Sequence, residues 1–240
     1  MRTWLRCFAL LLLPLVVASG GPAALEGKTP EARPAEGVSP EGPTEATLEA
    51  EFRGKREALR ASPEFKGSDA ETHFRLAEEL HHRGDLTGAT EEYWAAMKLK
   101  PEFAEAYRGL GIVLMDRHDW AGAVEALRTT TRLRQHDAEA FYWLGRSLMA
   151  QRDWAGATAA LRRATQLKPD DAEAYADLGL VRMAQGDPDG AAEALRLAVE
   201  LKPDNADTHS LLETVLTHQR DPDHVVRAAR RILDTLFARD

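Results

Sequence analysis

The sequence predicts an all-α fold, a right-handed α-solenoid of stacked helical hairpins that follows a disordered N-terminal segment. The first observation is a 34-residue period, which lies in the range typical of repeat arrays. The second is that each period contains two stretches with the apolar spacing of amphipathic helices, separated by a short break. The period is easiest to follow in five aspartates that stand 34 residues apart: Asp85, Asp119, Asp153, Asp187 and Asp221.

Residues 172–205 show one period most clearly. A first helix is predicted to begin at Ala172, and Gly186 ends it because glycine tolerates the left-handed turn that closes a helix. A second helix is predicted to begin near Asp189, and Pro203 ends it since proline cannot continue a helix. Each period is therefore predicted to be a helical hairpin, and hairpins of this size must stack on one another to bury a core.

Small residues recur where the two helices of a hairpin must touch. The eighth place of the five periods holds, in order, Ala77, Gly111, Gly145, Gly179 and Glu213. Glycine inside a helix costs roughly 1 kcal/mol relative to alanine, so its use in three periods indicates a steric need. Small residues also recur at the twentieth and twenty-seventh places. The fifth period has larger residues at all three places, Glu213, Val225 and Ile232, and we interpret it as a degenerate terminal cap.

This pattern resembles the tetratricopeptide repeat (TPR) family. The family has an aromatic residue at the fourth place, Leu-Gly at the seventh and eighth, two later alanines and a terminal proline, which here are Tyr175, Leu178, Gly179, Ala191, Ala198 and Pro203. The resemblance covers about 170 of 240 residues, as units 70–103, 104–137, 138–171 and 172–205 and a degenerate unit 206–239. It implies a TPR-like superhelix.

Three segments precede the array. Residues 1–20 have the positive start, apolar run and small residues of a signal peptide. Residues 21–46 are rich in proline and glutamate and are predicted to be a disordered linker, and helical spacing over 47–62 predicts an N-terminal capping helix. We therefore expect an exported protein of a bacterial type, periplasmic or secreted. The alternative is a tether to the inner membrane by an uncleaved signal; after signal removal no membrane span is expected.

Composition and motifs argue against several function classes. The 39 acidic and 31 basic residues give a net charge of −8, which disfavours a nucleic-acid partner. Neither a phosphate-binding loop nor a nucleophile motif is found, and the one cysteine, Cys7, lies in the predicted signal. His73, His81 and Glu78 lack the tight spacing of zinc ligands. We therefore expect no enzyme activity, no cofactor, no metal and no small-molecule substrate.

The resemblance also implies a binding groove, because in this family the first helices of successive units line a concave face. The places that commonly face this groove are occupied here by Phe74, Arg75, Glu78, Arg108, Ile112, Met115, Tyr142, Trp143, Arg146, Met149, Leu180 and Met183. Tyrosine and tryptophan are typical anchors of protein interfaces. An arginine beside them could hold a carboxylate or a backbone carbonyl of a peptide.

Two of these assignments have a structural alternative. Met115, Met149 and Met183 form a ladder with the repeat period, and such a ladder can either line a groove or fill the space between units. The alternative for Trp143 is packing between units, but groove exposure is favoured because Phe141 and Leu144 already fill the inward places beside it. Trp120 and Trp154, at the turn between helices, are predicted to be packing residues, as is Trp94.

Two functions follow from the sequence. The first is a non-catalytic scaffold or adaptor that binds a peptide segment or a protein partner in the concave groove. The second is a structural or assembly component of a cell-envelope complex that uses the ends of the array or its convex face.

Overall fold

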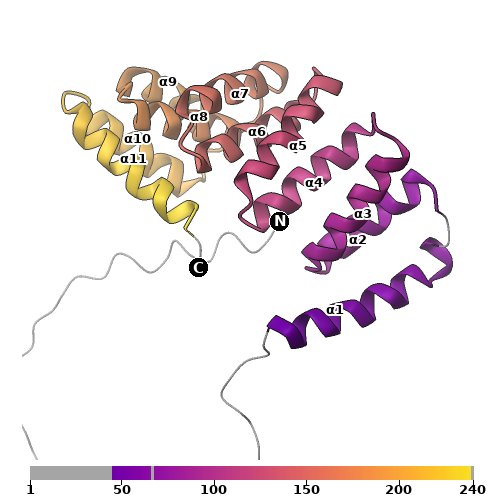
Figure 1. The fold of residues 1–240 in the computed structure, drawn as a ribbon. Helices are drawn as coiled ribbons and strands as arrows, with labels where there is room; N and C mark the ends of the chain where they lie inside the picture. Colours follow the sequence, from indigo (N-terminus) through magenta and orange to yellow (C-terminus); the bar gives the residue numbers. More distant parts are fainter. Residues whose placement is uncertain (1–44, 66–67, 239–240) are drawn as a thin grey trace, which may run out of the picture. The chain divides into compact units, whose positions relative to one another are not determined.

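The computed structural model describes residues 45–65 and 68–238, shown as coloured ribbon in Figure 1. The predicted signal peptide, residues 1–20, and the predicted linker up to residue 44 lie outside the described residues. All described residues belong to one compact unit. Over the described ranges the fold is all helical and contains no strand, which confirms the predicted fold class.

The helices follow one another as a single helix and five pairs. The single helix is α1 (Glu45–Arg60), and a short 3-10 helix, η3 (Pro63–Phe65), comes after it. The pairs are α2 (Ala70–His82) with α3 (Leu86–Leu99), α4 (Ala104–Asp116) with α5 (Trp120–Leu133), α6 (Ala138–Ala150) with α7 (Trp154–Leu167), α8 (Ala172–Gln185) with α9 (Pro188–Leu201), and α10 (Ala206–Thr217) with α11 (Pro222–Leu236).

Helix α1 begins two residues before the predicted start of the N-terminal helix and ends two residues earlier than predicted. The early start follows from composition, because Glu45 and its successors favour helix once the last proline, Pro43, has passed. The early end has a steric cause: the residue before a proline is biased away from helical dihedrals, and Ser62 precedes Pro63.

The five recurring aspartates are the N-caps of the second helices. The side chain of Asp119 accepts a hydrogen bond from the backbone N–H of Gly122 at 3.0 Å, and Asp153 does the same for Gly156 at 2.9 Å. Asp85, Asp187 and Asp221 cap their helices in the same way. A cap of this kind contributes about 1 kcal/mol, so the most visible period in the sequence is a period of helix starts.

The residue before each of the first four caps has a left-handed backbone. Gly84 and Gly186 take φ values of 82° and 76°, which glycine adopts without strain. His118 and Arg152 stand at the same place with φ values of 57° and 60°. A side chain in this conformation costs about 1 kcal/mol, so these two turns are strained by comparison with the glycine turns.

Within the hairpins, the recurrent glycines allow close contact. A Cβ atom added to Gly145 would lie 2.6 Å from the Cγ atom of Leu161, and one added to Gly179 would lie 2.6 Å from that of Leu195. Gly111 stands in the same relation to Leu127. The predicted steric need for a small residue is therefore present in three successive hairpins, because in each of them a leucine of the second helix lies against the glycine.

The fifth pair of helices does not form such a hairpin. Helix α10 packs on α9, as each first helix packs on the preceding second helix, but α11 packs on α8. In Figure 1 α11 is the last ribbon before the C-terminus. The reason lies in the two places that make the close contact in a regular hairpin. Glu213 replaces the glycine of the first helix, and Ala229 replaces the leucine of the second helix that packs on that glycine. The predicted degeneracy of the last unit thus redirects its second helix.

Candidate functional site

The predicted groove residues all lie on the first helices α2, α4, α6 and α8, but they differ in exposure. Arg75 and Glu78 are exposed. Six more are half-buried: Phe74, Arg108, Ile112, Tyr142, Trp143 and Arg146. Phe74 is set aside for the reason given below. The other seven side chains are called the first-helix face, and they are Arg75, Glu78, Arg108, Ile112, Tyr142, Trp143 and Arg146.

Phe74 is set aside because it supports the core. Its ring lies 5.0 Å from that of Phe103 and 6.0 Å from that of Tyr93, measured between ring centroids. Phe103 and Tyr93 are both buried, so Phe74 joins an aromatic group between the first two hairpins. Phe74 is therefore a packing residue whose ring is half-buried.

Four predicted groove residues do not face solvent. Met149 and Met183 are 1% and 0% exposed, and Met115 and Leu180 are buried as well. The placement of these four in an open groove is wrong, and the alternative interpretation of the methionine ladder as filler is correct. The physical reason is packing between elements: all four residues belong to one buried cluster, which also contains Val225, Ala229 and Leu233 of α11, and Met149 lies beside Leu233.

The centre of the first-helix face is an aromatic and charged group on α6. The rings of Tyr142 and Trp143 lie 5.1 Å apart in an edge-to-face arrangement. The guanidinium of Arg146 lies 5.9 Å from the first ring centroid and 5.8 Å from the second, which is cation–π distance. Its Nε atom is also 3.5 Å from Oδ2 of Asp177 on α8. The group is thus held in place across two units.

Burial changes the titration of this group. It raises the pKa of the Tyr142 hydroxyl, and the negative charge of Asp177 raises it further. Burial also raises the pKa of the Asp177 carboxyl, although the nearby Arg146 opposes the change. The guanidinium stays protonated because Asp177 and Tyr142 offset the effect of its own burial on its pKa. At neutral pH the tyrosine is therefore an uncharged hydrogen-bonding group.

Arg108, like Arg146, is already paired with an acid of the next unit. Arg108 of α4 lies 3.1 Å from Asp137 and 3.0 Å from Glu139, both at the start of α6. His81 of α2 lies 2.7 Å from Asp116 at the end of α4. The expected role of Arg108 in holding a partner's carboxylate would therefore require exchange of an existing ion pair. These pairs connect consecutive first helices.

The tryptophans at the turns behave as predicted, with one exception. Trp120 and Trp154 are half-buried and pack against the core. Trp94 is 59% exposed on the second helix α3, so its prediction as a packing residue is wrong. The repeat contained the signal, because the equivalent places of the next three units hold Arg128, Arg162 and Arg196, which are all exposed.

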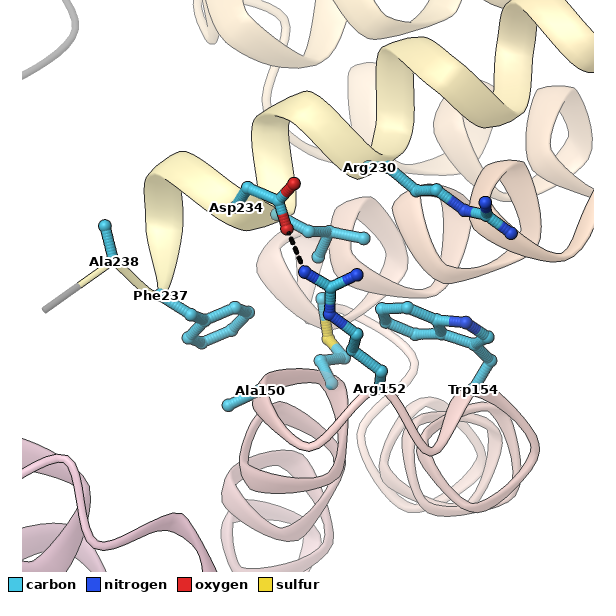
Figure 2. Close-up of a pocket in the computed structure, with 9 residues that line it drawn as sticks. Ala150, Arg152, Trp154, Arg230, Asp234, Phe237 and Ala238 are labelled. Carbon is cyan, nitrogen blue, oxygen red and sulfur yellow. Dashed lines mark hydrogen bonds and ion pairs between the residues drawn. The ribbon is translucent and has the colours of Figure 1, made fainter.

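A second surface was missed by the sequence analysis. A pocket of about 280 Å³ lies between the turn that joins α6 to α7 and the C-terminal half of α11. Figure 2 shows Arg152 and Trp154 on one side of it and Asp234 and Phe237 on the other. The one available signal was the spacing of Val225, Ala229, Leu233 and Phe237, which places an apolar row along α11.

The described residues lack two features that other functions would need. Among them, no group of three or more His, Cys, Asp or Glu side chains is arranged to hold a metal ion. None of the helices in the described part of the chain is both long enough and apolar enough to cross a membrane.

Stacked hairpins with accessible side chains on their first helices define a helical repeat scaffold for protein interactions. Two family models described as Tetratricopeptide repeat match the chain, one over residues 108–164 and the other over residues 144–217. Residues 108–217 of the chain are therefore tetratricopeptide repeats. Arrays of this family are typically non-catalytic. No curated protein sequence matches the chain.

Solved structures show the same fold. A MamA protein is 26% identical, covers 70% of this chain and 91% of its own, and superposes with a TM-score of 0.61. YrrB, described as a TPR protein with an unusual peptide-binding site, is 22% identical, with coverage of 77% and 91% and a TM-score of 0.59. PilF of Pseudomonas aeruginosa is 22% identical, with coverage of 70% and 75% and a TM-score of 0.57.

Proposed function

We propose that this protein is a scaffold that binds a peptide segment of a partner protein on its first-helix face. The observation that carries the proposal is the group formed by Tyr142, Trp143 and Arg146 on α6. Tyrosine, tryptophan and arginine are the residues that most often dominate binding energy at interfaces. Here the two rings and the guanidinium hold one another in position, so little side-chain entropy is lost when a partner binds.

The rest of the first-helix face favours a peptide with both apolar and polar side chains. Ile112 on α4 is apolar and half-buried, while Arg75 and Glu78 on α2 are exposed and of opposite charge. Interfaces commonly combine an apolar core with a polar rim in this way. The peptide-binding site named for YrrB, which has the same fold, supports this assignment.

Peptide display tests the proposal. Peptides selected from a random library on the full chain are expected to bind a Tyr142→Ala/Trp143→Ala variant at least tenfold more weakly, because loss of an anchor costs about 2 kcal/mol or more. The matched control is Trp94→Ala/Leu133→Ala, which removes exposed apolar side chains from second helices. Circular dichroism checks that both variants fold. Equal affinity of the peptides for the two variants would show that the first-helix face is not the binding site.

A second candidate function uses the second helices as an assembly surface. Trp94 and Leu99 at the end of α3 are 59% and 54% exposed, and Leu201 is exposed at the corresponding end of α9. Exposed apolar groups of this size favour contact with another subunit. In that case the chain would be a structural component of a complex, and Trp94→Ala would reduce assembly while Trp143→Ala would not.

We also propose that the chain is exported and acts in the periplasm or outside the cell, as the signal-like residues 1–20 suggest. The mass of the mature protein decides this. A cleaved signal predicts an N-terminus near Gly21, and an intact Met1 in the membrane fraction would favour the tethered form instead.

A further inference from the structure

Helix α11 does not pack on α10, the helix that precedes it in the sequence, but lies on other helices of the array. It packs on α8, and its Val226 side chain lies 3.5 Å from where a Cβ of Gly186, at the end of α8, would stand. Farther along, Asp234 reaches Arg152 in the turn between α6 and α7, and Phe237 reaches Trp120 at the start of α5. The helix therefore crosses the ends of three successive hairpins. We call the surface that it covers the α11 seat.

The seat is apolar where α11 covers it. Met149 and Met183 occupy equivalent places close to the C-terminal ends of α6 and α8. They share one buried cluster with Val225, Ala229 and Leu233. The three α11 residues are four apart and form a row on one side of the helix. Phe237 continues the row by one more step. An amphipathic helix lying on methionines is a recurrent mode of recognition, because methionine adapts to different side chains.

The C-terminal half of α11 leaves space beneath it. The pocket of about 280 Å³ lies beneath it, bordered by Met149, Trp154, Leu233 and Phe237 (Figure 2). The polar contact beside the pocket joins Arg152 and Asp234 at 2.7 Å, but their side chains are 63% and 56% exposed. An exposed pair of this kind contributes little to stability. Half of the seat is therefore filled incompletely by the helix that occupies it.

The departure of α11 also leaves α10 uncovered. Leu216 of α10 is 43% exposed, and Leu211 and Leu212 are only half-buried. In a regular unit the second helix would cover such residues, as α9 covers Leu178 of α8. Glu213 prevents the close approach that a glycine permits at this place in three other units. The position of α11 is thus a result of interactions with the seat rather than of pairing with α10.

From these contacts we propose that the α11 seat is a binding site for an amphipathic helix of a partner protein, and that α11 is an internal ligand which the partner displaces. The partner helix carries apolar residues at positions i, i+4, i+8 and i+12, as in Val225, Ala229, Leu233 and Phe237. It also carries an acidic residue at i+9, the position of Asp234, which pairs with Arg152. The site is distinct from the first-helix face, and this inference does not depend on the function proposed above.

A labelled synthetic peptide of residues 221–238 is the probe, and the full chain is the receptor. Leu233→Asp places a charge in the buried row of α11 and releases the helix from its seat. The released variant is expected to bind the peptide at least tenfold more tightly than the natural chain, measured by fluorescence anisotropy. The matched control is Thr235→Asp, which adds the same charge on the exposed side of α11 and is expected to behave like the natural chain.

Two further variants examine the details of the seat. A peptide in which Ala229 is replaced by Glu should not bind the released variant, because it interrupts the apolar row. Adding Arg152→Ala to the released variant should weaken peptide binding severalfold. The first-helix double variant Tyr142→Ala/Trp143→Ala should bind the peptide as the natural chain does, so a failure of the peptide-display proposal is distinguishable from a failure here. If Leu233→Asp folds without tighter peptide binding, the proposal is overturned.

Hydrogen exchange on the natural chain provides a second measurement if Leu233→Asp fails to fold. A displaceable helix opens without global unfolding, so the backbone amides of α11 should exchange faster than those of α8 and α9. Equal protection of α11 and α8 at all denaturant concentrations would mean that α11 cannot leave separately, and the proposal would then be wrong.

Discussion

Arg56 of α1 and Asp85 at the start of α3 form a buried bidentate ion pair. The Nε and Nη2 atoms of the guanidinium donate to the two carboxylate oxygens at 2.8 Å each, and the side chains are 7% and 3% exposed. Asp85 also caps α3 through the N–H of Gly88. Leu59, on the same helix as Arg56, joins the buried cluster of the first hairpin. The pair therefore connects the non-repeat helix to the first helix start of the array.

Removing the arginine of this pair should detach α1. Arg56→Ala leaves a buried carboxylate without its partner, and such a loss costs about 3 kcal/mol or more unless the site opens to water. We expect a lower free energy of unfolding and faster hydrogen exchange over residues 45–60. Arg53→Ala on the same helix is the control, because Arg53 is exposed. Unchanged exchange in Arg56→Ala would show that the other contacts of α1, among them the pair of Arg60 with Glu92, are enough to hold it.

The glycines of the hairpins should not tolerate a methyl group. Gly179→Ala places a Cβ atom 2.6 Å from Leu195, and overpacking of this kind costs about 1–3 kcal/mol although alanine is the better helix former. Gly54→Ala in α1 is the matched control, because a Cβ atom there has no neighbour within 4 Å. Urea denaturation should show that the first variant loses stability and the second gains up to about 1 kcal/mol. A gain in both would mean that Leu195 adapts freely.

Replacing Arg152 by glycine should relieve the strain of the left-handed turn and so stabilise the protein. Because Arg152 also pairs with Asp234, the comparison is made in an Asp234→Ala background. In that background Arg152→Gly should raise the free energy of unfolding by about 1 kcal/mol, the strain of a side chain at a positive φ of 60°. Gln151→Gly is the control and should lose stability, since Gln151 has a φ of −81°. A loss in both variants would argue against strain.

The Asp177 carboxyl should make stability depend on pH in a defined direction. Burial raises its pKa above the ordinary value of 3.8, so its contribution is present below that pH and is lost as the pH rises through the folded-state pKa. The stability of the natural chain relative to Asp177→Asn should therefore fall between acidic and neutral pH. Denaturation curves of both proteins at several pH values measure this difference. A difference that rises with pH would mean that Arg146 outweighs burial.

Much of the fold was predictable because it depends on local interactions that repeat. The caps at Asp119 and Asp153, the left-handed turn at Gly186 and the tight contact at Gly179 each involve residues within one unit. Four repetitions of the same local pattern make such a prediction reliable. The first-helix residues Tyr142 and Trp143 were predictable for the same reason, since their places follow from the register of the repeat.

The candidate sites were less predictable because exposure depends on contacts far apart in sequence. Met149 occupies a place that is commonly open in this family, and nothing near it in sequence indicates that Leu233 belongs to the same buried cluster. Arg108 was available to a ligand by its place in the repeat, yet Asp137 of the next unit already pairs with it. In both cases a residue far away in the sequence determines whether the side chain is accessible to a ligand.

The amino-acid sequence alone determined the number of units, the ends of their helices and the family of the chain, because periodic caps and small residues act over a few neighbouring positions. The tertiary structure alone decided the position of α11 and the burial of the methionine ladder. The physical reason is that Glu213 excludes one packing partner without specifying another. The helix then lies where its apolar row finds a complementary surface.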